Sequence, residues 1–132
     1  MIVLDVSTLV GAAIGRGSVP YQAMHRAFAT NKVAKSAPVI AELLDVFARP
    51  KLARFLVADL RDEVVSLFAL LGILYAPTVP VSDCRDFKDN KYLELALAAA
   101  ADIIITSDND LLILQPWRGI RILSPADYIA SG

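Results

Sequence analysis

Short apolar runs alternate along the chain with longer segments in which apolar residues recur at helical spacing. Residues 103–106 (Ile-Ile-Ile-Thr) form the clearest run and predict a central strand. The clearest helical stripe consists of Ile40, Leu43, Leu44 and Phe47. This alternation predicts an α/β fold, and we expect a three-layer α/β/α sandwich around a mostly parallel sheet of about five strands. We expect residues 1–132 to form a single domain, because the length suits one core.

Turn residues and caps give the expected bounds of each element. We expect strands at residues 2–5, 33–35, 73–75, 103–106 and 121–123. We expect helices at residues 7–14, 20–30, 37–49, 52–56, 60–71, 91–101, 111–114 and from 125 onward. Ser36 and Asp59 are the expected N-caps of the third and fifth helices, and Ser124 precedes the last one. The stretch from Pro77 to Pro80 is an expected loop.

Composition narrows the range of functions. Hydrophobic residues make up 56% and charged residues 20%, which excludes a disordered chain. The net charge is −1, from 13 basic and 14 acidic side chains, which excludes a uniformly basic nucleic-acid binder but allows a local basic patch. The longest apolar stretch, around residues 95–101, is too short to span a bilayer. We expect no signal peptide and a cytoplasmic location.

The chain has one cysteine, Cys84, and one histidine, His25. A lone cysteine forms no intrachain disulfide and provides no thiolate zinc site, and a lone histidine provides no histidine pair for a metal. We expect Cys84 to be a buried or half-buried free thiol. We expect His25 to lie on a helix, in a surface or packing role.

Acidic residues lie where a parallel sheet binds ligands. Asp5 and Asp108 follow predicted strands, Glu42 lies on the third helix, and Asp89 precedes the alanine-rich helix. Ligands of open parallel sheets bind beyond the carboxyl ends of the strands. Carboxylates that meet there would form an oxygen-rich site suited to Mg²⁺ or Mn²⁺. The pattern therefore indicates metal-assisted phosphodiester chemistry.

Each acid also has a purely structural interpretation. Asp5 would cap the following helix, although Ser7 can supply that cap and leave Asp5 free. Glu42 would be a solvated helix residue. Asp86 and Asp89 both precede a helix, where an acid caps the backbone and complements the helix dipole. Capping accounts for one of these two acids more readily than for both.

Hydroxyl and basic side chains accompany the acids. Thr106 and Asp110 flank Asp108, where they would orient a carboxylate or a metal-bound water, or else form a plain polar turn. Basic residues near the acids are candidates for RNA phosphate contacts, or else belong to a solvated surface. They are Arg49, Lys51, Arg54, Arg85, Lys88 and Lys91.

Several segments in a fixed order carry a family resemblance. They are Val3-Leu-Asp5, Pro38-Val-Ile-Ala-Glu42-Leu, Ala48-Arg-Pro-Lys-Leu52, Cys84-Arg-Asp86-Phe-Lys-Asp89-Asn-Lys-Tyr-Leu-Glu-Leu-Ala96, Ala101-Asp-Ile-Ile-Ile-Thr-Ser-Asp108-Asn-Asp-Leu-Leu112 and Ile122-Leu-Ser-Pro-Ala126. Together they resemble the PIN-domain nucleases, in particular the VapC-like toxin components of bacterial toxin–antitoxin pairs. The resemblance covers nearly the whole chain. It implies an α/β/α sandwich and Mg²⁺- or Mn²⁺-dependent cleavage of single-stranded RNA.

The same resemblance implies roles for the acids. Asp5, Glu42 and Asp108 match the first, second and last acids of the family motif. Some relatives carry the third acid where this chain has Asn90, so Asp89 is the expected third acid and Asp86 an outer candidate. Asp5 and Asp108 would be the main metal ligands, Asp89 would bind directly or through water, and Glu42 would position the attacking water.

The chain departs from the family at its start, where the usual Asp-Thr-Asn is Asp5-Val6-Ser7. Ser7 still offers a hydroxyl, but Val6 offers none, which weakens the expected support of the metal site. Relatives of the toxin type bind a small antitoxin protein over the active groove, and homodimers are common among them. Two alternatives remain open: a catalytically weakened PIN-fold interaction module, and a flavodoxin-like nucleotide-binding domain. The second lacks a glycine-rich phosphate loop after the first strand.

Overall fold

Parallel strands and the helices that connect them make up the computed structural model, which describes residues 1–131. The expected domain boundary, residue 132, lies outside this described part. A three-stranded sheet has the order β1-β4-β5, and a two-stranded sheet pairs β2 with β3. The strands are β1 (Ile2–Leu4), β2 (Ala34–Lys35), β3 (Ile73–Leu74), β4 (Ile103–Ile105) and β5 (Arg121–Leu123). All of these pairings are parallel.

The two sheets meet at a single parallel bridge between Ile2 and Val33. The backbone amide of Ile2 donates to the carbonyl of Lys32 at 2.8 Å beside it. The predicted α/β class with a parallel sheet is therefore confirmed. The prediction of about five strands in one sheet needs correction, because the strands divide into groups of three and two that share only this bridge.

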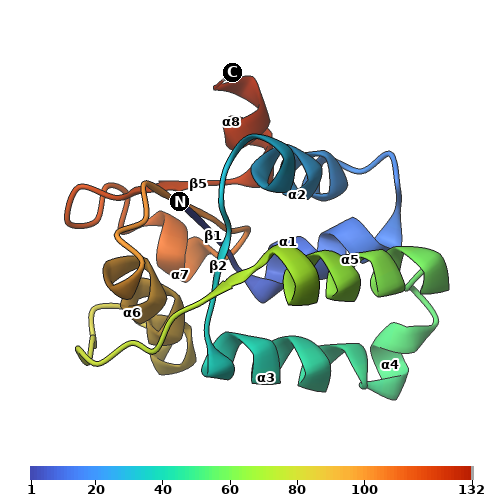
Figure 1. The fold of residues 1–132 in the computed structure, drawn as a ribbon, viewed down its shortest axis with the longest axis horizontal. Coiled ribbons are helices and arrows are strands. Elements are labelled where there is room, and N and C mark those ends of the chain that lie inside the picture. The colour runs from blue at the N-terminus through green and yellow to red at the C-terminus, as the bar shows by residue number, and fades with distance from the viewer. Residues whose placement is uncertain (132) are drawn as a thin grey trace.

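Helices cover both faces of the strands (Figure 1). The helices are α1 (Val6–Ile14), α2 (Val19–Thr30), α3 (Ala37–Phe47), α4 (Pro50–Ala53), α5 (Ala58–Leu71), α6 (Asn90–Ala98), α7 (Asn109–Leu112) and α8 (Pro125–Ala130). A short 3-10 helix, η1 (Phe87–Asp89), leads directly into α6. Helices α2 and α8 lie on one side of the strands, and α3 and α6 lie on the other (Figure 1).

The core follows from the apolar runs. Every residue of β1 and β4 is buried, as expected for parallel strands covered on both faces. The expectation that residues 103–106 provide the central strand is confirmed, because β4 lies between β1 and β5. Helix α6 packs its buried Leu93, Leu95 and Ala96 toward these strands. None of the helices in the described part of the chain is long and apolar enough to cross a membrane.

Several element bounds differ from those expected. Asp59 is not the cap of α5: Val57 occupies that position, and Asp59 lies in the first helical turn, where its charge complements the helix dipole. Helix α4 begins at Pro50 instead of residue 52, because proline suits the first turn of a helix. Helix α6 ends at Ala98, and Ala100 then adopts a positive φ of 50°, which ends the predicted helix early.

Candidate active site

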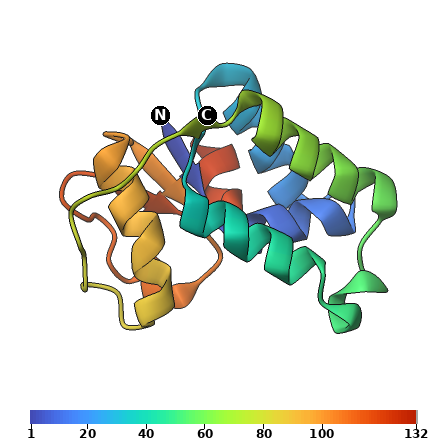
Figure 2. The ribbon, with the colours of Figure 1, turned by 60° about the horizontal axis from the view of Figure 1, so that its bottom comes forward.

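A cavity of about 620 Å³ opens beyond the carboxyl ends of β1 and β4. All four acids of the predicted motif line it, namely Asp5, Glu42, Asp89 and Asp108. Asp5 directly follows β1, and Asp108 lies three residues beyond β4. The other two acids come from α3 and from the junction of η1 with α6, two helical segments on the same side of the molecule (Figure 2).

Asp5 is buried, with an exposed fraction of 3%. Its carboxylate accepts hydrogen bonds from the Ser7 hydroxyl at 2.7 Å, from the Thr8 backbone amide at 3.0 Å and from the Thr106 hydroxyl. Burial raises the pKa of Asp5, and these hydrogen bonds counteract the shift in part. The expectation that Ser7 takes over the cap of α1 is wrong: Asp5 is the N-cap, and the Ser7 hydroxyl donates to it.

Glu42 is held by two residues of α6. The Lys91 ammonium donates to Glu42 Oε2 at 2.9 Å, and the Tyr92 hydroxyl donates to Oε1. The same hydroxyl accepts from the Val6 backbone amide at 3.2 Å. Burial, and then the hydrogen bond to Glu42, raise the pKa of Tyr92. Glu42 is therefore not a solvated helix residue but a fixed, half-buried carboxylate.

Tyr92 lines the cavity, and the sequence analysis did not identify it. Its sequence does contain a signal. Tyr92 follows Asp89 by three positions, and residues at that spacing lie on the same side of a helix. An acid at the start of a helix that faces a cavity therefore indicates that the residue one turn later faces it too.

Asp89 carries an unusual carboxylate. Its exposed fraction is 8%, and its Oδ2 atom has no hydrogen-bond partner among residues 1–131. It occupies the N-cap position of α6 but accepts no capping hydrogen bond there. Burial and then the adjacent Asp108 carboxylate raise the pKa of Asp89 to about 8, with smaller effects from the charges of Asp86 and Glu42. The carboxyl group therefore retains a proton at neutral pH when no cation is nearby.

Asn90, which stands where some relatives carry the third acid, has a structural role in this chain. It is buried, accepts from the Cys84 backbone amide at 2.8 Å and donates to the Phe87 carbonyl at 3.2 Å. These bonds hold the turn that precedes α6. Asp89, and not Asn90, lines the cavity.

Three carboxylates form the tightest acidic cluster in the described structure. Single oxygens of Asp86, Asp89 and Asp108 all lie within 4.8 Å of one another. Asp86 also caps η1 through the Lys88 amide at 3.2 Å, and Asp108 caps α7 through the Asp110 amide at 2.9 Å. Asp5 lines the same cavity without belonging to this cluster. The structure thus brings the outer candidate Asp86 closer to Asp89 and Asp108 than the sequence indicates.

Thr106 connects the acids of the two strands. Its buried hydroxyl donates to Asp5 and accepts from the Asp108 backbone amide at 2.9 Å. The Ser7 hydroxyl similarly accepts from the Ser107 amide at 3.3 Å. Asp110, expected as a supporting residue, contributes its backbone to these contacts; within residues 1–131 its side chain is not part of the cavity wall.

The predicted phosphate-binding residues fall into three groups. Arg49 and Lys51 line the cavity. Lys91 is paired with Glu42. Arg85 and Lys88 are exposed, and neither contributes to the wall of the cavity in the described structure. The rest of the cavity wall is apolar, and its residues are Val6, Val10, Val46, Leu52 and Phe55.

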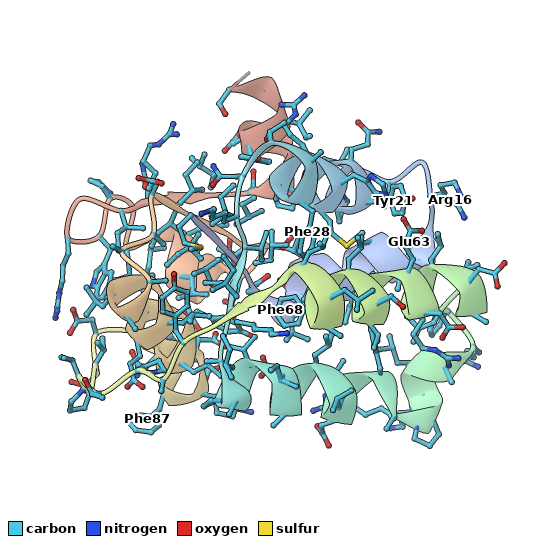
Figure 3. All side chains as sticks on the ribbon, in the orientation of Figure 1. Arg16, Tyr21, Phe28, Glu63, Phe68 and Phe87 are labelled. Atoms are coloured by element: carbon cyan, nitrogen blue, oxygen red, sulfur yellow. The ribbon has the colours of Figure 1, made fainter. Side chains whose placement is uncertain are left out.

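The lone cysteine and histidine lie outside the cavity wall. Cys84 is a buried free thiol, as expected, and burial raises its pKa. His25 lies on α2 and contacts Glu63 at 2.7 Å, beside Tyr21 and Arg16 (Figure 3). The Tyr21 hydroxyl donates to the same carboxylate at 2.8 Å. This surface cluster joins α2 to α5.

Comparison with known proteins identifies three similarities. Residues 1–110 match the family model described as the PIN domain. The chain is 28% identical over 116 residues to the uncharacterized protein MJ1680 of Methanocaldococcus jannaschii, which covers 86% of this chain and 74% of that protein. The crystal structure of PAE2754 from Pyrobaculum aerophilum is similar in fold, with a TM-score of 0.56 and 16% identity over 98% of this chain and 87% of that one.

Proposed function

Because the chain belongs to the PIN-domain family, whose members are generally nucleases, we propose that it is a metal-dependent endoribonuclease that cleaves single-stranded RNA. The observation that supports this most strongly is the buried, unpartnered carboxylate oxygen of Asp89 beside Asp86 and Asp108. A protein rarely buries acids so close together without a counter-charge. This family assignment favours the nuclease interpretation over the flavodoxin-like alternative.

The acids fit a small divalent cation. Their donor atoms are carboxylate oxygens, which Mg²⁺ and Mn²⁺ prefer over the nitrogen and sulfur ligands of softer metals. Asp89 and Asp108 would hold the cation, together with Asp5 and with Asp86 as an outer ligand. When bound, such a cation supplies charge for the phosphate and lowers the pKa of a bound water.

The chain's own residues fix the other reacting groups. Asp5 is oriented by the Ser7 and Thr106 hydroxyls, so it adopts one position in the cavity. Glu42 is oriented by Lys91 and Tyr92, and it would accept a proton from the attacking water. The missing Val6 hydroxyl is offset in part, because the Val6 amide supports Tyr92 through its backbone.

Arg49 and Lys51, on the wall of the same cavity, would bind the phosphates that flank the cleaved bond. Such contacts set affinity and position without reading the base sequence. Their small number agrees with the net charge of −1, because a protein that cleaves a flexible single strand needs only a local basic rim.

We further propose that the protein is the toxin of a toxin–antitoxin pair. The apolar side of the cavity, formed by Val10, Val46, Leu52 and Phe55, suits an antitoxin segment with apolar side chains, and Phe55 is 55% exposed. Co-expression with the protein encoded by the neighbouring short reading frame tests this. The two proteins should copurify and RNA cleavage should fall, whereas full cleavage by a mixture of the two would reject the pairing. Homodimer formation, a further expectation, is measured by light scattering of the purified protein.

The nuclease proposal is tested by single-turnover cleavage of single-stranded RNA with and without Mg²⁺ or Mn²⁺. The wild type should cleave only with the metal, and Asp108→Asn should lose at least about 100-fold in rate, the scale on which one lost electrostatic group acts. Asp62→Asn, an exposed acid of α5, is the matched control and should cleave normally. Equal cleavage by the wild type and Asp108→Asn would reject the proposal.

A further inference from the structure

A second cavity, of about 430 Å³, lies beyond the carboxyl ends of β2 and β3. Its volume falls in the range of small-molecule sites, roughly 300–1,000 Å³. The wall combines apolar and polar side chains, of which Ser36, Pro38, Tyr75, Pro77, Lys91 and Glu94 matter here. The sequence analysis attached no function to this region beyond a loop at residues 77–80.

The second cavity lies beside the acidic one, and one ion pair separates them. Glu42 lines the acidic cavity, Lys91 lines the second, and their side chains are joined at 2.9 Å. A nucleotide strand whose phosphate lies at the acids would therefore place a neighbouring base within reach of the second cavity.

Three polar groups of the second cavity differ in what they can bind. Glu94 is acceptor-only, and one of its oxygens accepts from the Val81 amide at 3.0 Å. Lys91 is donor-only. Ser36 both donates and accepts, so the set offers acceptors on Glu94 and donors on the other two residues.

Ser36 supplies an independent sign of a ligand. It is 1% exposed, and its hydroxyl has no hydrogen-bond partner within the part of the chain that the structure describes. It occupies the N-cap of α3, yet it does not accept from the helix backbone as a capping serine ordinarily does. A buried hydroxyl that is left unsatisfied in this way indicates a missing partner.

We propose that the second cavity is a guanine-binding subsite, which sets the base next to the phosphate that the proposed nuclease cleaves. The Watson–Crick edge of guanine presents two adjacent donors, the N1 and N2 groups, followed by the O6 acceptor. Glu94 accepts from the two donors, and Lys91 and Ser36 donate to O6. Tyr75 and the two prolines pack against the base, as aromatic and apolar side chains do when they bind single-stranded RNA.

The other bases match this set of groups less well. Adenine and cytosine place a ring acceptor next to their amino group, and that acceptor would face the Glu94 carboxylate. Uracil has one donor between two carbonyl oxygens, one of which would face the same carboxylate. A site that leaves a buried polar group unpaired rejects a ligand strongly, so the proposal predicts selectivity for guanine.

Titration calorimetry with the four nucleoside 5′-monophosphates, in metal-free buffer, tests the subsite. Guanosine monophosphate should bind the wild type tighter than the other three by roughly tenfold or more. Glu94→Gln should remove this preference, because glutamine can still accept from the Val81 amide but presents a donor in place of the second acceptor. Ser36→Ala should weaken guanosine monophosphate binding while the melting temperature holds, because the hydroxyl it removes has no partner in the described structure.

Glu63→Gln is the matched control, since Glu63 lies in the cluster between α2 and α5, away from α6 (Figure 3). It should keep the guanine preference. Equal affinities for all four nucleotides in the wild type, or a preference that persists in folded Glu94→Gln, would overturn the subsite.

The two proposals fail separately. A protein that binds guanosine monophosphate through Glu94 but cleaves no RNA would reject the nuclease and leave the guanine subsite in place. Metal-dependent cleavage at positions that do not change between the wild type and Glu94→Gln would reject the subsite alone.

Discussion

The Tyr92 hydroxyl donates a hydrogen bond to Glu42, which lies 50 positions earlier in the chain, and accepts one from the Val6 amide. One phenol thus joins α6, α3 and α1 at the wall of the acidic cavity. The position of Glu42 depends on this contact and on Lys91.

Tyr92→Phe removes the donor to Glu42 and leaves the Val6 amide without its acceptor. A buried donor left unpaired costs about 1–3 kcal/mol, so the free energy of unfolding should fall by that amount. RNA cleavage should fall about 10- to 100-fold, the usual effect of losing a group that orients an active-site carboxylate. Urea denaturation and single-turnover cleavage measure the two effects. Tyr21→Phe, which loses the corresponding bond to Glu63, should affect stability alone. Unchanged cleavage by Tyr92→Phe would show that the phenol does not position Glu42.

Asp89 makes the metal-free protein less stable as the pH rises. Its folded-state pKa of about 8 lies above its ordinary value of 3.8, so the folded protein binds more protons than the unfolded chain between these pH values. Stability must then fall as the pH increases from about 4 to about 8. Asp89→Asn has no such proton to lose.

The free energy of unfolding of Asp89→Asn should therefore exceed that of the wild type at pH 8 by at least ~1 kcal/mol, since one pKa unit corresponds to about 1.4 kcal/mol. Urea denaturation in the presence of a chelator, at pH 5 and pH 8, measures the difference. A wild type whose stability rises over this range as much as that of Asp89→Asn would disprove the elevated pKa. For the same reason, Mn²⁺ affinity of the wild type should increase with pH, because the cation displaces the proton.

Thr106→Val removes the hydroxyl that donates to Asp5 and accepts from the Asp108 amide. Both acids lose orientation, so Mn²⁺ affinity should decrease about 10- to 100-fold. Calorimetric titration with Mn²⁺ measures this. Thr30→Val, whose exposed hydroxyl bonds only to the Arg26 carbonyl, is the matched control and should bind Mn²⁺ normally. If the two variants bound Mn²⁺ equally well, Thr106 would have no part in the site.

Lys51→Ala removes a charge from the cavity wall. RNA binding should weaken uniformly across base sequences, and the salt dependence should decrease by roughly 0.7 per phosphate contact on a single strand. Fluorescence anisotropy at several salt concentrations measures both quantities. Lys32→Ala, in the exposed segment before β2, should leave the salt slope as it is. An unaltered slope in Lys51→Ala would place the RNA elsewhere.

The sequence predicts the fold well where local chemistry determines it. The strand at residues 121–123 and the Ser124 cap of α8 match the structure, because an apolar run and a serine–proline start are local signals. The cap of α5 was wrong, because Asp59 suits both the cap and the first turn, and the sequence does not distinguish the two. The division of the strands into two sheets depends on the packing of β2 and β3, which the sequence pattern does not contain.

For the candidate site, the sequence identifies the acids but not their neighbours. Asp5 and Asp108 follow buried strands, so a burial argument finds them. The contacts of Tyr92 with Glu42 and of Thr106 with Asp5 join residues 50 and 101 positions apart, and only the tertiary fold brings them together. Lys91 was expected to bind phosphate, whereas it forms an ion pair with Glu42, because α6 and α3 meet at the cavity.

Anomalous diffraction from crystals soaked in Mn²⁺ shows where the protein holds a cation. We predict a peak inside the acidic cavity, in direct contact with carboxylate oxygens of Asp89 and Asp108. The peak should disappear in crystals of Asp89→Asn. A saturated crystal with no peak between these two acids, or with Mn²⁺ bound only at other positions, would mean that they do not form a cation site and that the metal-dependent mechanism is wrong.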